Sequence, residues 1–250
     1  MISNYYLLPE FTPARLQDLV LWLEPASLRG NTWYNLAPCY GDRNHGTAHG
    51  GVGLSTWYPQ FLPAPIFYGD DEYVEVPDSE NLDITDAITI EFWGIVKAQS
   101  PDEQHFVSKG YNRYLFYIGR NSYRLIFWFA ATNPHSYGYF ILTPNVLTHV
   151  VGTYDKDGGD NNYKVYINGE LHHQYTLTGA IGVDNGPLCI GRMGSLVERF
   201  LNGLIPLVRI YKAALTPTEV VHNYTHHPLH LLQRGIDPYV FIKRKKFYFL

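Results

Sequence analysis

Thr148-His149-Val150-Val151-Gly152-Thr153-Tyr154 is the stretch that decides the fold, because its β-branched and aromatic residues are typical of a β-strand. The turn-forming segment 155–162 follows, and Tyr163-Lys164-Val165-Tyr166-Ile167 then alternates large and polar side chains, as a half-buried strand does. Asn168-Gly169 is a strong signal for a two-residue hairpin. The sequence therefore predicts three consecutive antiparallel strands in this part of the chain.

Short β-prone runs separated by turn-forming residues occur on both sides of this centre. The predicted strands lie at 19–23, 73–76, 88–96, 106–108, 114–118, 123–129, 139–142, 188–192 and 204–211. The segment 29–53 is interpreted as a loop, and the capping box Thr216-Pro217-Thr218-Glu219 predicts one short helix from Pro217 to about Tyr224. This spacing is typical of an all-β protein with two packed antiparallel sheets.

The order of these fragments resembles the laminin-G-like, concanavalin-A-like jelly-roll family. In that family a His-Val-containing strand ends in Thr-Tyr-Asp, as at 149–155, and leads into a Val-Tyr-Ile-Asn-Gly strand, as at 165–169. Fragments at 67–77, 88–93, 107–110, 188–192, 202–205, 208–211 and 214–216 match in the same order. The resemblance implies a two-sheet jelly-roll sandwich, and the run at 19–26 is similar to the first strand of phage and bacterial members.

The chain has 250 residues, of which 46% are hydrophobic, and it is long enough to build the core of one domain. We expect an N-terminal arm at 1–15, the laminin-G-like domain at 16–225 and a C-terminal arm at 226–250. The C-terminal arm has apolar and aromatic residues on both sides of a basic run, so a free end would expose an apolar surface that tends to associate. Its candidate assembly residues are Tyr239, Phe241, Lys243, Arg244, Phe247, Tyr248 and Phe249, which we expect to dock on the chain's own domain or on a neighbouring molecule.

Charge and hydropathy argue against several classes of protein. A net charge of -4 argues against a nucleic-acid-binding protein, which normally has a basic face. No apolar run reaches the length of a membrane span, and residues 1–10 lack the basic start and apolar core of a signal peptide. Cys39 and Cys189 are expected to be free thiols.

Calcium is the one cofactor that the sequence suggests. The resemblance implies an ion site that includes an acidic residue after the first strand, where Glu24 stands, but Pro206 occupies the place of the family's second acid. Asp70 and Asp71 precede a predicted strand and are either turn-forming residues or oxygen ligands. The acidic turn 155–162 is expected to be a solvated hairpin loop.

Four histidines near the predicted helix permit two interpretations. His222, His226, His227 and His230 have spacings that suit either a zinc site or a surface cluster. Pro228 interrupts the helix, and no cysteine or carboxylate completes a ligand set. We therefore expect a surface cluster near the helix end.

No catalytic residues are predicted. Glycan-cleaving relatives carry glutamate and aspartate at alternate strand positions, so that two carboxyl groups face one groove. Here Glu72 and Glu75 are three positions apart and would face opposite sides of a strand, and Glu91 stands alone. We therefore expect no enzyme, and a glycosidase is the less favoured reading.

Candidate ligand-binding residues lie in two predicted loops. They are Tyr111, Asn112 and Arg113 in the first loop, and Asn133, His135 and Tyr137 in the second. Aromatic rings stack on sugar rings, and amide, imidazole and guanidinium groups form hydrogen bonds with hydroxyls. The same residue types also occur at protein interfaces, and aromatic residues fill sandwich cores, so these alternatives stay open here.

The leading functional hypothesis is a non-catalytic structural or adhesive module on the surface of a phage or virus particle, as a decoration, capsid or tail protein that also binds glycans. The terminal arms would pair with other copies or with other virion proteins, because apolar ends outside a complete domain can add to neighbouring sheet edges. The alternative is a carbohydrate-binding module that is soluble or on a cell surface. Either hypothesis predicts a virion or extracellular location.

Overall fold

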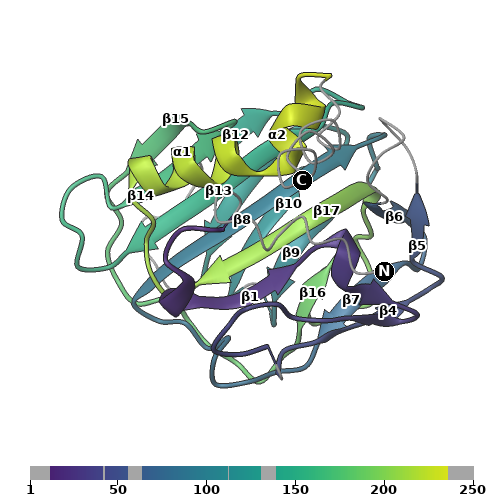
Figure 1. The fold of residues 1–250 in the computed structure, drawn as a ribbon, viewed down its shortest axis with the longest axis horizontal. Coiled ribbons are helices and arrows are strands. Elements are labelled where there is room, and N and C mark those ends of the chain that lie inside the picture. Colours follow the sequence, from purple (N-terminus) through teal and green to yellow (C-terminus); the bar gives the residue numbers. More distant parts are fainter. Residues whose placement is uncertain (1–11, 42, 56–63, 112, 131–138, 236–250) are drawn as a thin grey trace, which may run out of the picture.

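The computed structural model describes residues 12–41, 43–55, 64–111, 113–130 and 139–235. These residues form two antiparallel sheets packed face to face, with two short helices on the outside of one sheet (Figure 1). The predicted two-sheet sandwich is confirmed. Both cysteines are free, with Cys39 exposed and Cys189 buried.

One sheet has eight strands. They are β1 (Leu19–Leu23), β5 (Gly53–Ser55), β6 (Ala64–Tyr68), β8 (Ala87–Val96), β13 (Thr148–Asp155), β14 (Tyr163–Ile167), β15 (Glu170–Tyr175) and β17 (Asn202–Tyr211). Their order is β15-β14-β13-β8-β17-β6-β5, and β1 also pairs with β17. Two 3-10 turns, Leu16–Asp18 and Pro25–Ser27, flank β1.

The other sheet has nine strands. They are β2 (Leu28–Arg29), β3 (Thr32–Trp33), β4 (Gly46–His49), β7 (Tyr73–Val76), β9 (Gln104–Lys109), β10 (Tyr114–Ile118), β11 (Arg124–Phe129), β12 (Tyr139–Ile141) and β16 (Leu188–Ile190). Their order is β12-β11-β10-β9-β16-β7-β4-β3-β2.

The three strands predicted at the centre of the chain are β13, β14 and β15. Val151 lies opposite Tyr166 in the first hairpin, and Tyr166 lies opposite Leu171 in the second. The prediction of a loop over 29–53 is wrong, because β3, β4 and β5 form there. These strands are only two to four residues long, which is too short for a recognisable alternating pattern in the sequence.

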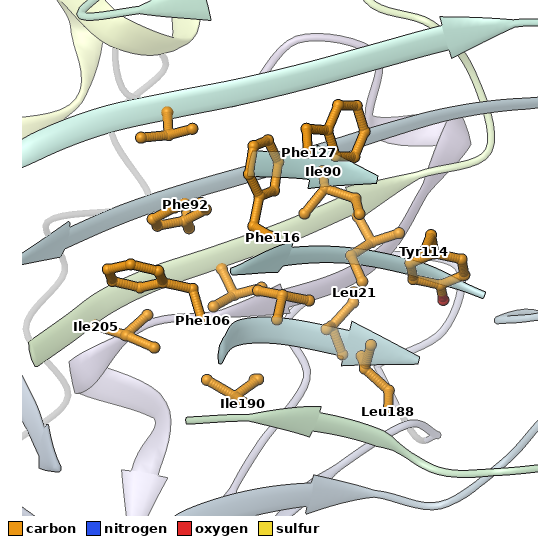
Figure 2. Close-up of a cluster of buried hydrophobic side chains, with 14 of the residues drawn as sticks. Leu21, Ile90, Phe92, Phe106, Tyr114, Phe116, Phe127, Leu188, Ile190 and Ile205 are labelled. Atoms are coloured by element: carbon orange, nitrogen blue, oxygen red, sulfur yellow. The ribbon is translucent and has the colours of Figure 1, made fainter. Parts of the chain in front are cut away.

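The core lies between the sheets and is rich in aromatic residues (Figure 2). Phe116 and Phe127 stack with ring centroids 4.3 Å apart. Gly152 on β13 faces this stack, and a Cβ added there would overlap the Phe127 ring. The predicted inward face of β11, which carries Leu125, Phe127 and Phe129, is confirmed, since all three residues are buried in the core.

Two helices, not the one predicted, cover the outer face of the eight-stranded sheet (Figure 1). The first is α1 (Pro217–His226), and its capping box is confirmed because the Glu219 N–H donates to Thr216 Oγ1 at 3.3 Å. The second is α2 (Pro228–Gln233), which the sequence reading missed because Pro228 was treated only as a helix breaker, although proline also suits a first helical position. Neither described helix is long and apolar enough to cross a membrane.

Candidate functional site

One end of the nine-stranded sheet gathers loops from distant parts of the sequence. Leu188 lies opposite both Val76 and Lys109, and Lys109 also lies opposite Tyr114. The strands β7, β9, β10 and β16 therefore all start or stop at the same end. The described loop segments there are 43–46, 77–83, 110–113 without residue 112, and 182–187, and we call this region the loop end.

The first predicted binding loop lies at the loop end and is fixed by one carboxylate. The Tyr111 N–H and Arg113 Nε both donate to Asp184 Oδ2 at 2.8 Å, and the Gly186 N–H donates to Asp184 Oδ1 at 2.9 Å. Burial raises the pKa of Asp184, but these hydrogen bonds outweigh burial and lower it, so Asp184 is ionised at neutral pH. Tyr111 itself is 57% exposed and available to a ligand.

Ala130, the last described residue before the second predicted binding loop, lies beside the first loop. The Ala130 N–H donates to Arg113 O at 3.1 Å, and the Gly182 N–H donates to Ala130 O at 3.2 Å. The other predicted ligand residues, Asn112, Asn133, His135 and Tyr137, lie outside the described residues, so their place in a common site stays a prediction.

A hollow of about 580 Å³ opens at the loop end, a size that suits a small-molecule site. Sequence reasoning missed it, because its two walls come from segments that meet only through the pairing of β4 with β7. All its lining residues except Pro77 have polar side chains; they are Arg43, Asn44, His45, Thr47, Pro77, Asp78, Ser79, Glu80 and Asn81.

Two polar residues of this hollow are held by contacts behind it. Asn44 Oδ1 accepts from Ser79 Oγ at 2.8 Å, and Asn44 Nδ2 donates to Val20 O at 3.4 Å. His45 Nδ1 accepts from the Asn35 N–H at 3.1 Å, so the proton of the neutral ring lies on Nε2. Both side chains are therefore fixed before any ligand arrives.

One charged residue of the hollow, Asp78, is held by an ion pair, whereas Arg43 and Glu80 have no described side-chain partner. Asp78 Oδ1 accepts from Lys109 Nζ at 2.7 Å, which fixes the carboxylate. Arg43 and Glu80 are exposed, and neither forms a side-chain hydrogen bond or ion pair with another described residue. The hollow thus offers one fixed carboxylate together with an exposed cation and an exposed anion.

The three predicted metal ligands lie in different environments. Glu24 is buried, and burial raises its pKa to about 8 although Arg209 and a hydrogen bond from Trp22 oppose the shift. Asp70 and Asp71 are exposed in the turn before β7. Among the described residues, no three histidine, cysteine, aspartate or glutamate side chains form a metal-binding group, and the calcium role of these three residues stays a prediction.

A buried polar cluster lies on the outer face of the eight-stranded sheet, under α1. Glu91 accepts from Arg209 Nη1 at 3.1 Å and Asn223 Nδ2 at 2.8 Å, and it lies 3.0 Å from His149 Nε2. Burial raises the pKa of Glu91, but Arg209 and His149 outweigh it and lower the pKa to about 2. Glu91 is fully buried, so it ties the helices to the sheet and is closed to a substrate. Its partners are 58 or more positions away, so the sequence alone could not show them.

The histidines near the helices do not form the expected surface cluster. His222 and His226 stack on α1 with ring centroids 4.3 Å apart. His227, however, is buried, and its Nδ1 accepts from the Leu229 N–H at the start of α2. Burial, reinforced by the charge of Arg209, lowers the pKa of His227 well below its usual value.

A second open surface lies on the outer face of β10, β11 and β12. Phe116, Phe127 and Phe140 point inward, so the alternate residues of these strands point outward. The outward residues are Tyr117, Arg124, Ile126, Trp128, Tyr139 and Ile141, which we call the outer strip, and the Arg124 guanidinium lies 4.3 Å from the Tyr139 ring centroid. Most side chains of the strip are aromatic or aliphatic, whereas most side chains of the hollow are polar.

Comparisons with solved structures agree on the fold. The binding domain of Paraclostridial Mosquitocidal Protein 1 has a TM-score of 0.63 and 16% identity, over 84% of this chain and 52% of that one. Domain 4 of AbnA, an arabinanase from Geobacillus stearothermophilus in complex with arabinotriose, has a TM-score of 0.63 and 19% identity, over 83% of this chain and 98% of that domain. The binding domain of Botulinum neurotoxin DC in complex with rat synaptotagmin II has a TM-score of 0.58 and 16% identity, over 84% of this chain and 51% of that one.

The chain spans about half the length of the two toxin domains, and all three identities are low enough that they show the fold alone. No curated protein matches the sequence. A laminin G family model, described as the Concanavalin A-like lectin/glucanases superfamily, matches residues 68–221. This match covers more than half of the chain and confirms the predicted resemblance. The chain therefore belongs to the concanavalin A-like lectin/glucanase superfamily.

Proposed function

We propose that this protein is a non-catalytic binding module that binds a glycan at the loop end. The observation that carries the proposal is the hollow of about 580 Å³, whose Asn44, His45 and Asp78 side chains are held by hydrogen bonds to other protein groups. A site fixed in advance loses little conformational entropy on binding. Carboxylate, amide and imidazole groups in one hollow match the mixed donors and acceptors of sugar hydroxyls.

Tyr111 would extend this site. Its backbone is fixed by Asp184, and its exposed ring can stack on a second sugar unit. Two similar structures support the choice of ligand. One is the arabinanase domain in complex with arabinotriose, and the other is from botulinum neurotoxin type C, whose cell entry depends on interaction with two ganglioside molecules. Glu91 is closed to substrates, so we propose no catalytic role for it.

The particle-surface role is a second, separate proposal, supported by the likeness of the first strand to phage proteins. Attachment would use the C-terminal arm, whose candidate residues Tyr239, Phe241, Lys243, Arg244, Phe247, Tyr248 and Phe249 all lie outside the described residues. Deleting residues 236–250 tests it. An unchanged oligomeric state and unchanged attachment to particles would reject it and leave the alternative of a soluble or cell-surface carbohydrate-binding module.

The glycan proposal is tested with an array of glycans, followed by calorimetric titration of each hit. Arg43→Ala and Glu80→Ala should each weaken binding about tenfold, because each removes a charged hydrogen-bonding group from the hollow. Neither residue has a described side-chain partner whose loss would disturb the fold.

Arg120→Ala and Glu198→Ala are matched controls, since both are exposed charged residues outside the hollow. They should leave affinity unchanged. An array without hits, or hits that Arg43→Ala and Glu80→Ala do not weaken, would contradict the proposal.

A further inference from the structure

The side chain of Lys109 ends in a cage of four oxygen atoms. Its Nζ lies 2.7 Å from Asp78 Oδ1, 3.2 Å from Asp83 Oδ1, 2.9 Å from Asp184 O and 2.8 Å from Gly186 O. The side chain is only 1% exposed. The cage thus encloses a single positive charge almost completely.

The oxygens of this cage are of the type that hard metal ions prefer. Two carboxylates and two backbone carbonyls resemble part of a calcium coordination shell, which is built from the same groups. An ammonium group has three N–H donors, and the distances of 2.7–3.2 Å are hydrogen-bond distances. The Lys109 ammonium group therefore occupies a place whose four oxygen atoms would also suit a free metal ion.

The cage joins three segments that are far apart in the sequence. The partners of Lys109 are 26 to 77 positions away from it. On one side the ammonium fixes Asp78 in the wall of the hollow. On the other side it holds the backbone of Asp184, whose carboxylate fixes the Tyr111 loop. Both parts of the loop end are thus positioned by one nitrogen atom.

We propose that the Lys109 ammonium takes the place of a structural metal ion at the loop end, so that the loops and the ligand site are set without any divalent cation. Removing the ammonium would leave two facing carboxylates and two carbonyls around an empty space, which is a site for Ca²⁺. Lys109 is a positioning residue, because its partner Asp78, and not Lys109 itself, lines the hollow. Of the experiments described below, only the measurement of glycan affinity rests on the proposed function.

Thermal unfolding of the full chain in EDTA and in excess CaCl₂ tests the proposal without any glycan. The wild type should have the same Tm in both. Lys109→Met should lower Tm by about 10 °C in both, because it leaves two carboxylates without their cation while its side chain still fills the space. Lys109→Ala should show a similar loss in EDTA and recover at least half of it in CaCl₂.

A wild type that loses stability in EDTA would overturn the proposal, and so would a Lys109→Ala variant on which CaCl₂ has no effect. If Lys109→Ala does not fold in EDTA, refolding it in CaCl₂ decides the matter, since recovery of folded protein supports the cation site and failure rejects it. Once a glycan hit is known, EDTA should leave its affinity for the wild type unchanged. A protein with no glycan hit would still pass or fail the unfolding test, so the two proposals can fail separately.

Discussion

Two buried glutamates show how one residue type takes two protonation states in the same region. Glu91 faces Arg209 and His149 at hydrogen-bond distance, and its pKa falls to about 2. Glu24 is also buried and accepts the Trp22 Nε1–H, but burial outweighs this hydrogen bond and the charge of Arg209, and its pKa rises to about 8. At neutral pH Glu91 is therefore ionised and Glu24 is protonated.

This difference predicts a pH effect at Glu24. Its folded pKa lies above its unfolded value of 4.5, so folding binds a proton between pH 4.5 and about 8, and stability falls as pH rises through that window. Glu24→Gln keeps the shape of the side chain but replaces the titratable carboxyl group with a neutral amide. The variant should therefore be more stable than the wild type at pH 8 by roughly 4 kcal/mol and equally stable near pH 4.5. Urea unfolding at both values measures this, and a difference that does not depend on pH would contradict it.

The sequence revealed only part of the candidate site. Tyr111 and Arg113 were predicted because a loop between two strands carried residue types that bind ligands. Lys109 was visible as a residue of a family fragment, but its cage was not, because no local pattern marks oxygens that come from two loops far from Lys109 in the sequence. His227 was misplaced on the surface, because burial by a following helix cannot be read from the spacing of histidines.

At the scale of elements, most strands that the sequence predicted carry a clear run of β-prone residues, whereas β6 was missed although it has five residues. Strand β13 is rich in β-branched residues, and β14 alternates large and polar side chains. The Asn168-Gly169 hairpin turn predicts where β15 starts. The short strands β2 and β3 have two residues each, which is too few for any periodicity. The capping box of α1 was found because it is a local motif, whereas α2 depends on packing against the sheet.

The capping box of α1 predicts a measurable loss on truncation. Thr216→Ala removes the acceptor of the Glu219 N–H at the helix start and should cost about 1 kcal/mol in the free energy of unfolding. Thr218→Ala is the matched control, because Thr218 is exposed inside the same first turn and alanine is a good helix former. Chemical denaturation compares the two, and equal stability of both variants would argue against the cap.

The start of α2 predicts acid sensitivity. His227 is buried and its folded pKa lies well below its unfolded value, so the unfolded chain binds an extra proton below about pH 6.5 and stability falls as pH falls through that point. His227→Asn keeps an acceptor for the Leu229 N–H but cannot be protonated in this range, so its stability should change less between pH 7 and pH 5. His226→Asn, at an exposed position on α1, should behave as the wild type does, and an acid response unchanged by His227→Asn would refute this role.

At the scale of the whole molecule, the two sheets have different outer faces. Helices α1 and α2 close the outer face of the eight-stranded sheet over an apolar cluster and the Glu91 network (Figure 1). The nine-stranded sheet keeps two open regions, the polar hollow at the loop end and the apolar outer strip. We place the proposed ligand site at the loop end, because Asn44, His45 and Asp78 are held there by hydrogen bonds.

The most direct test of this account is to locate a bound glycan on the full chain, by NMR titration of backbone amides in a buffer that contains EDTA. The account predicts that the amide shifts of segments 43–47 and 77–81 and of Tyr111 change on addition of an array hit, with the metal chelated throughout. Shifts confined to the outer strip, such as at Trp128 and Tyr139, or binding that EDTA abolishes, would contradict it.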